Sequence, residues 1–182
     1  MSFNTEAKYY DAFHKDKNYK KEAKEIRKKF PKAKTILEVG CGTGNLTCEL
    51  EKLGFKVTCV EPSKEMLKFF KGKTKNVIVK KINEPWFFEW NKEFDVSLAM
   101  YDVLNYLPTL DCIDVMNKML KISKDCVFEL WSYGPVKPFT YKRAGNLHRI
   151  RLGFTYNHKT HLWYFFFGDG FLVEKHTLYL HT

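Results

Sequence analysis

The sequence has no apolar stretch that approaches the roughly 20 residues that a membrane-spanning helix needs. It also has no internal repeat and no low-complexity segment. The N-terminal segment lacks the apolar core of a secretion signal and contains acidic residues, which transit peptides usually avoid. These absences exclude a membrane-spanning protein and a repeat protein, and they predict a cytoplasmic location.

Signals for a metal site are missing as well. The five cysteines form no CxxC pair and no Cys/His spacing typical of a zinc site. Three of them lie inside apolar runs, where free cysteine acts as a small buried side chain. We therefore expect no metal.

The length of 182 residues fits one domain with a sizeable core, which we expect to span the whole chain. The net charge of +10 would suit a nucleic-acid partner. However, the lysines are spread along most of the chain and are densest at residues 15–34, around an amphipathic helix pattern. This distribution favours solvated helix faces, and nucleic acid is not the expected partner.

Short apolar runs alternate with helical stripes after an N-terminal arm and helix that occupy residues 1–34. The spacing of apolar residues predicts that helix at 19–30, before Pro31. Continuous apolar runs, which suit strands covered on both faces of a parallel sheet, follow at residues 35–39, 57–60, 76–82, 94–100 and 126–131. Helical stripes lie between them at residues 46/50/53, 66/67/70 and 113/116/120. The pattern predicts a doubly wound, mostly parallel α/β core at residues 35–132 with a Rossmann-like sheet.

The last part of the chain, residues 133–182, has a different pattern. Gly134, Pro135, Pro138 and Gly145 break any helix, and the apolar residues then alternate. Residues 149–156 and 161–167, joined around 157–158, predict a hairpin, and residues 171–180 predict a third strand. We expect an antiparallel β appendage.

A ligand site is predicted where the first two strands end. Ligands of open α/β sheets bind beyond the carboxyl ends of the strands. Gly40, Gly42 and Gly44 follow the first strand, where glycine lets the backbone turn close to a ligand. Glu61 ends the second strand, where a carboxylate can accept both hydroxyls of a ribose. A dinucleotide site would need a last glycine where Asn45 stands, so this spacing does not favour a pyrophosphate.

Residues 38–44 (EVGCGTG) resemble the first motif of class I S-adenosylmethionine-dependent methyltransferases. Residues 61–67 (EPSKEML) and 94–96 (FDV) are similar to later motifs of that family, in the same order. The resemblance implies S-adenosylmethionine as the cofactor, with its methionine part at the glycine turn. Asn83 and Glu84 stand where family members usually carry an aspartate for the adenine amino group. The cofactor contacts that the resemblance implies are Glu38, Gly40, Cys41, Gly42, Gly44, Asn45, Glu61, Pro62, Met66, Asn83, Glu84, Met100 and Tyr101.

Weaker sequence similarities narrow the class of substrate that the resemblance implies. Residues 17–23, 100–107, 129–131 and 174–182 resemble segments of nucleotide-linked aminosugar N,N-dimethyltransferases. They imply methyl transfer to nitrogen or oxygen of a small molecule, with a sugar or sugar nucleotide as the narrower guess. Two alternatives stay open, namely an RNA methyltransferase and a non-catalytic partner subunit that binds the cofactor. The sequence has neither an NPPY-like tetrapeptide nor a Pro-Cys pair, which would favour the RNA reading.

The chain departs from that family after the fifth strand, where a class I core has two more strands. Either the hairpin at residues 149–167 replaces them, or the chain is a shortened form. An incomplete core exposes a sheet edge, which a second copy of the chain or the aromatic segment 163–167 could cover. A homodimer is therefore among the expectations, and this aromatic segment equally suits ordinary packing within the appendage.

Three residues are candidates for the chemistry. A general base is needed only if the acceptor arrives protonated. His14 has a suitable pKa class, although a histidine on a polar arm also suits plain solvation. Asp102 follows the fourth strand and could act as base or cap the next segment. Tyr10 could fold over the cofactor as part of a lid that excludes water.

Overall fold

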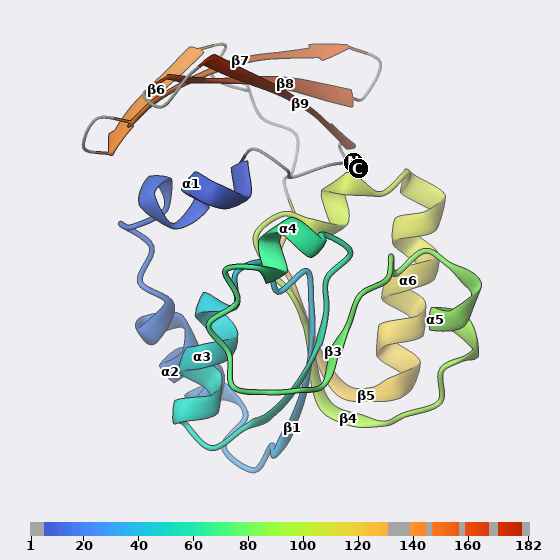
Figure 1. The fold of residues 1–182 in the computed structure, drawn as a ribbon. Helices are drawn as coiled ribbons and strands as arrows, with labels where there is room; N and C mark the ends of the chain where they lie inside the picture. The colour runs from blue at the N-terminus through green and yellow to red at the C-terminus, as the bar shows by residue number, and fades with distance from the viewer. Residues whose placement is uncertain (1–5, 131–138, 145–146, 157–158, 168–170, 180–182) are drawn as a thin grey trace.

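The computed structural model describes residues 6–130, 139–144, 147–156, 159–167 and 171–179, with side chains described for residues 7–130. These residues form two separate sheets (Figure 1). The first sheet is parallel throughout and has the order β3-β2-β1-β4-β5. Its strands are β1 (Thr35–Val39), β2 (Lys56–Val60), β3 (Val77–Ile78), β4 (Phe94–Ala99) and β5 (Ser123–Phe128).

Helices cover both faces of the first sheet. The helical elements are α1 (Glu6–Phe13), α2 (Tyr19–Lys29), α3 (Asn45–Lys52), α4 (Lys64–Leu67), α5 (Pro85–Glu89), η1 (Val103–Tyr106) and α6 (Thr109–Ile122). Ile36 of β1 packs in one buried cluster with residues of α2 and α3. The next residue, Leu37, packs in the other cluster with residues of α5 and α6. This alternation follows from the strand period of two, and the predicted doubly wound α/β class is confirmed.

Helix α2 forms where the apolar spacing predicted it. Asn18 caps its N-terminus by accepting the backbone N–H of Lys21 at 2.9 Å. The helix buries Ala23 and Ile26 against the first sheet and ends before Pro31. Thus the N-cap, the apolar stripe and the proline after the helix all agree with the observed bounds of α2.

The face of α6 was predicted wrongly. Ile113 and Leu120 were expected to face the sheet, but they are 49% and 55% exposed. The residues that α6 buries are Cys112, Val115, Met119 and Ile122. Both sets repeat at helical spacing, so the apolar period alone does not decide which face packs. The fifth strand was also placed too late, because α6 leads directly into β5 at Ser123.

The third strand is much shorter than predicted. Only Val77 and Ile78 pair with β2, whereas residues 76–82 were expected to form a strand. β3 lies at the edge of the sheet and has one partner strand. An edge position leaves the remaining backbone groups free to turn toward solvent or other loops.

The second sheet is antiparallel and contains β6 (Phe139–Ala144), β7 (Leu147–Tyr156), β8 (Lys159–Phe167) and β9 (Phe171–Tyr179). The predicted hairpin and third strand correspond to β7, β8 and β9, while β6 was missed among its flanking helix breakers. The hairpin does not replace the last core strands, because β7 and β8 pair only within the second sheet. Within the described strands β5 remains an edge of the first sheet, and the expected homodimer stays a prediction.

Some expectations lie outside what the structure describes. These are the end of the predicted fifth strand at 131, the helix breakers at 134, 135, 138 and 145, the hairpin turn at 157–158, the chain end at 180–182 and the side chains of the aromatic segment 163–167.

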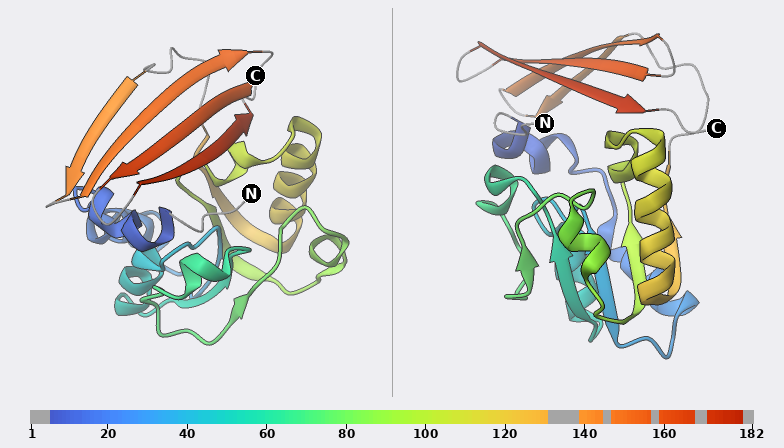
Figure 2. Two further views of the ribbon diagram at one scale, coloured as in Figure 1. Left: turned by 45° about the horizontal axis from the view of Figure 1, so that its top comes forward. Right: turned by 90° about the vertical axis from the view of Figure 1, so that its right-hand side faces the viewer.

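The second sheet lies over the edge of the first sheet at which the parallel strands end (Figure 2). β6 contacts α1, and β9 contacts η1. The region beyond β1, β2 and β4 is therefore bordered by the first sheet below and by α1 and the second sheet above. Among the described helices, none has the length and apolar character to cross a membrane.

Candidate functional site

A cavity of about 370 Å³ lies beyond the ends of β1, β2 and β4. Its position is the one expected for ligands of an open α/β sheet, since the strand order reverses between β1 and β4. Eleven of the residues predicted for the site line this cavity: Tyr10, Glu38, Gly40, Cys41, Gly42, Asn45, Glu61, Pro62, Met66, Asn83 and Tyr101. Five others, namely His14, Gly44, Glu84, Met100 and Asp102, are not among the lining residues.

The glycine turn forms the floor of the cavity. Gly40 and Gly42 have φ angles of +72° and +56°, which are the left-handed conformations that glycine tolerates. The Gly40 N–H donates to the carbonyl of Val60 at 2.7 Å and so fixes the turn to β2. A Cβ at Gly40 would lie 2.1 Å from a methyl group of Val103. The turn therefore has no room for a side chain there.

Glu61 links the second strand to the glycine turn. It is buried, and its two carboxylate oxygens accept the backbone N–H groups of Gly42 at 2.9 Å and Ser63 at 2.8 Å. Burial raises the pKa of Glu61, and these two hydrogen bonds oppose the rise. Each oxygen retains acceptor capacity that a ribose hydroxyl could use.

Glu38 is the second buried carboxyl group of the cavity. Its only described hydrogen bond comes from the Thr47 hydroxyl, at 2.6 Å. Burial raises the pKa of Glu38 to about 8, against the lowering effect of the Thr47 hydrogen bond.

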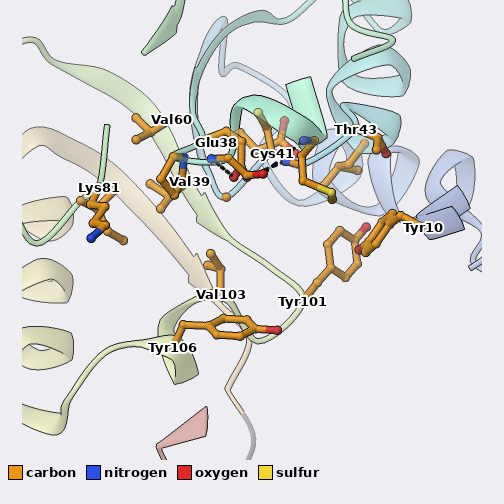
Figure 3. A pocket seen from close by; sticks show the side chains of 18 of the residues that line it. Tyr10, Glu38, Val39, Cys41, Thr43, Val60, Lys81, Tyr101, Val103 and Tyr106 are labelled. Carbon is orange, nitrogen blue, oxygen red and sulfur yellow. Dashed lines mark hydrogen bonds between the residues drawn. The ribbon is translucent and has the colours of Figure 1, made fainter. Parts of the chain in front are cut away.

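Three tyrosines line the cavity: Tyr10 and Tyr101 lie at the end away from Lys81, and Tyr106 lies apart from them, next to Val103 (Figure 3). The Tyr101 hydroxyl donates to Glu22 of α2, and the Lys17 ammonium lies 3.5 Å from the centre of the Tyr101 ring. Burial, and then the bond to Glu22, raise the pKa of Tyr101. These contacts hold the ring in place, so this end of the cavity has an ordered aromatic wall.

Asp102 and Tyr101 both have positive φ angles, of 62° and 61°, which is uncommon for residues other than glycine. Asp102 precedes η1 but makes no side-chain cap, so the capping alternative is wrong. In the described part of the chain its Oδ1 is buried without a hydrogen-bond partner. Burial, and then the nearby Glu129 carboxylate, raise the pKa of Asp102 to about 6. Its proposed role as a base stays a prediction.

His14 contacts Tyr10. Its Nδ1 lies 2.8 Å from the backbone oxygen of Tyr10, and the two rings stack with centres 4.2 Å apart. His14 therefore contacts a residue that lines the cavity but does not line the cavity itself. Its role as a base stays a prediction too.

Asn83, offered for the adenine contact, lines the cavity and donates to the Asp111 carboxylate at 2.8 Å. Its side-chain oxygen is thereby oriented by a residue of α6. Glu84 stands just before α5, at the N-cap position. The adenine role of either residue stays a prediction.

Several lining residues were not among the predicted contacts. Thr43 lies inside the glycine motif, Val103 lies in the segment 100–107, and Lys81 lies in the apolar run 76–82. Asp11 contacts two lining residues, accepting hydrogen bonds from Thr43 at 2.9 Å and Asn45 at 2.6 Å. Only the proximity of Asp11 to Tyr10 in the sequence could have pointed to it.

The cavity can hold a small organic ligand, and the side chains described around it form no metal-binding cluster. Among the residues that the structure describes, no group of three His, Cys, Asp or Glu side chains could hold a metal ion. Pockets of this size bind cofactors and metabolites through apolar walls and a few fixed polar groups. Glu61, Glu38 and the backbone of the glycine turn are those groups here.

Comparison with known proteins agrees with this geometry. Residues 36–125 match the family model described as a methyltransferase domain. A protein of Bacillus subtilis (strain 168) that is named as a methyltransferase is 28% identical over 134 residues, which are 68% of this chain and 52% of that protein. The chain thus spans about half the length of the curated relatives it first matches.

Solved structures show the same fold at low identity. DesVI of Streptomyces venezuelae has a TM-score of 0.79 at 20% identity, covering 96% of this chain and 83% of that one. CalS10, an amino pentose methyltransferase from Micromonospora echinaspora solved with S-adenosylmethionine bound, has a TM-score of 0.76 at 17% identity. That match covers 100% of this chain and 84% of CalS10.

Proposed function

We propose that the chain transfers a methyl group from S-adenosylmethionine to a small molecule, because residues 36–125 match the model of a methyltransferase domain and the fold is shared with S-adenosylmethionine-dependent methyltransferases. The acceptor atom is a nitrogen or an oxygen. One observation carries the proposal: the buried Glu61 carboxylate, which ends β2, is hydrogen-bonded to the glycine turn at the floor of the cavity.

The residues fit this cofactor. The Glu61 oxygens can accept ribose hydroxyls while they hold Gly42 and Ser63. A Cβ at Gly42 would lie 3.1 Å from the end of the Met66 side chain, so the turn leaves a narrow channel for the methionine part. The cofactor supplies an electrophilic methyl group on a sulfonium.

What the protein contributes to such a transfer is chiefly positioning. Holding the acceptor in line with the methyl group is worth up to about 7–11 kcal/mol. The aromatic rings of Tyr10 and Tyr101 would exclude water from their end of the cavity. Asp102 and His14 are the candidate bases for an acceptor that arrives protonated.

The narrower substrate proposal is a sugar or sugar nucleotide. It is supported by the fold shared with CalS10, an amino pentose methyltransferase, and with KedS8, a sugar N-methyltransferase. Release of S-adenosylhomocysteine in the presence of amino- and hydroxyl-sugar nucleotides tests this. Turnover on other small amines or alcohols but on none of these would overturn the sugar proposal alone. Cofactor binding without turnover on any acceptor would favour the non-catalytic partner subunit.

Replacement of Glu61 tests the cofactor site. We expect Glu61→Ala to weaken S-adenosylmethionine binding by about 10- to 100-fold, because a charged acceptor of hydrogen bonds contributes about 1.5–3 kcal/mol. Gly42→Val should also weaken binding, because it fills the channel beside Met66. Isothermal calorimetry with S-adenosylmethionine and S-adenosylhomocysteine measures both effects.

The matched control is Glu25→Ala, which removes an exposed carboxylate of α2 and should leave affinity unchanged. If neither compound binds the wild-type protein, the proposed function is wrong. If both compounds bind and neither pocket variant loses affinity, the binding site lies elsewhere.

A further inference from the structure

Asp11 joins three segments that are far apart in the sequence. Its Oδ1 accepts hydrogen bonds from Thr43 of the glycine turn and Asn45 at the start of α3. Its Oδ2 lies 2.6 Å from the ammonium of Lys71, which follows α4. Lys71 also donates to the Asn45 side-chain oxygen at 2.9 Å, and its backbone N–H donates to the Thr43 carbonyl at 2.9 Å. Every polar group of this cluster is thus bonded to another of its members.

The cluster connects two segments that line the cavity, the glycine turn and α1. Thr43 and Asn45 line it from the glycine turn, and Tyr10, the neighbour of Asp11, lines it from α1. Figure 3 shows Tyr10 and Thr43 on the same side of the cavity. α1 also packs against α4, while Tyr9 and Phe13 are buried. A shift of α1 at Asp11 would therefore move Tyr10 and loosen the turn together.

The electrostatics favour a charged Asp11. Burial acts to raise the pKa of Asp11, but the hydrogen bonds from Lys71, Asn45 and Thr43 outweigh it, and the pKa lies below the ordinary value. The Asp11 and Lys71 side chains are 35% and 47% exposed, so water and salt reach the ion pair. The contact is therefore one that dissolved salt can weaken.

We propose that Asp11 is a positioning residue of the cofactor cavity: it clamps α1 onto the glycine turn and thereby slows the release of bound cofactor. The proposal rests on the proposed function, because it assigns Asp11 a part in retaining that cofactor. Asp11 does not line the cavity, so its effect passes through Tyr10, Thr43 and Asn45.

The first experiment measures how fast S-adenosylhomocysteine dissociates, by stopped-flow competition. Asp11→Ala removes all three contacts of the carboxylate, and we expect dissociation about tenfold faster, the effect of losing roughly one charged hydrogen bond. Asp16→Ala is the matched control, because Asp16 is exposed on the same arm, and its rate should equal that of the wild type. An unchanged rate in Asp11→Ala overturns the proposal.

The second experiment separates the ion pair from the other hydrogen bonds. Asp11→Asn keeps an oxygen for Thr43 and Asn45 but loses the charge, and Lys71→Met removes the other partner. We expect wild-type dissociation to quicken with salt and that of either variant to depend less on salt. The double variant should be no faster than the faster single variant. Additive effects of the two substitutions on the dissociation rate, or an equal salt dependence of that rate in all proteins, would overturn the proposal. Lys75→Met is the control, because Lys75 is an exposed lysine.

A third measurement needs no ligand and also serves if Asp11→Ala folds poorly. Hydrogen exchange of Asp11→Asn should quicken in residues 6–13 and 40–47 together, with residues 109–122 unchanged. Exchange that quickens in only one of the first two segments overturns the coupling. If the wild-type protein binds no cofactor, both the proposed function and the proposed role of Asp11 in retaining the cofactor are wrong. If the wild-type protein binds the cofactor and Asp11→Ala releases it at the wild-type rate, only the role of Asp11 is wrong.

Discussion

At the scale of single residues, the two buried carboxyl groups of the cavity differ in how they are satisfied. Glu61 accepts two backbone N–H groups, whereas Glu38 has one described partner, the Thr47 hydroxyl. Fixed N–H donors stabilise a carboxylate, and a single hydroxyl does so less. Burial is the main cause of the rise in the pKa of Glu38 to about 8, and the single hydrogen bond from Thr47 opposes it only in part.

A pH dependence of stability follows from Glu38. Its pKa is 4.5 ordinarily and about 8 in the folded chain, so above pH 4.5 the unfolded chain releases a proton that the folded chain keeps. The stability that Glu38 contributes is therefore present below pH 4.5 and is lost as pH rises toward 8. Glu38→Gln does not ionise, and its amide oxygen can still accept from Thr47. Urea unfolding should show a steeper loss of stability with pH in the wild type than in this variant.

Glu25→Gln is the control for that experiment, because Glu25 is exposed and the variant should follow the wild-type curve. The raised pKa of Glu61 acts in the same direction and is common to all three proteins. Equal slopes for wild type and Glu38→Gln would contradict the assignment.

The sequence predicted the residues at the ends of β1 and β2 better than the residues that reach the cavity from α1 and η1. Glu38, the glycine turn and Glu61 are local features, since each stands at the end of a strand that its own apolar run predicts. Asp11 and Val103 reach the turn only through tertiary contacts, Asp11 across more than 30 residues. Spacing along a chain contains no information about such contacts. The predicted role of each lining residue remains to be measured.

At the scale of elements, α6 shows where periodicity fails. Two stripes at helical spacing lie on this helix, and the less obvious one is buried. The sequence alone does not say which of the two stripes faces the sheet, because both have the same period. The strands β1 and β4 were predictable because they are central and continuously apolar, whereas β3 and β6 are sheet edges with few partners.

Alanine substitutions on adjacent residues of α6 test its corrected face. Met119 is fully buried, and Met119→Ala should lower the free energy of unfolding by about 2–5 kcal/mol because it leaves a cavity. Leu120 is 55% exposed, and Leu120→Ala should change it by less than about 0.5 kcal/mol. Urea unfolding measures both, and the opposite ranking would restore the face that the sequence favoured.

At the scale of the whole molecule, the charge of +10 needs an explanation that does not invoke nucleic acid. The described ion pairs are exposed or half-exposed lysine–carboxylate contacts of Lys21, Lys52, Lys68, Lys71 and Lys124. Such pairs contribute little stability each. Dispersed charge of this kind raises general affinity for polyanions without creating a specific site.

We therefore expect only weak RNA binding. Fluorescence anisotropy with an unstructured RNA should give a dissociation constant no tighter than about 1 μM at physiological salt, which is the non-specific range. Affinity should fall steeply as salt increases, as counterion release requires. Tight binding that persists at physiological salt would revive the RNA methyltransferase alternative.

The two sheets share no strand pairing among the described strands. Among the described elements, β6 of the second sheet contacts α1, and β9 contacts η1. Residues 139–179 could thus diverge, or be exchanged with another antiparallel sheet, without breaking one hydrogen bond of the ladder that holds Gly40 and Glu61. During evolution, the second sheet could therefore change while the glycine turn and the proposed methyl-donor site stayed the same.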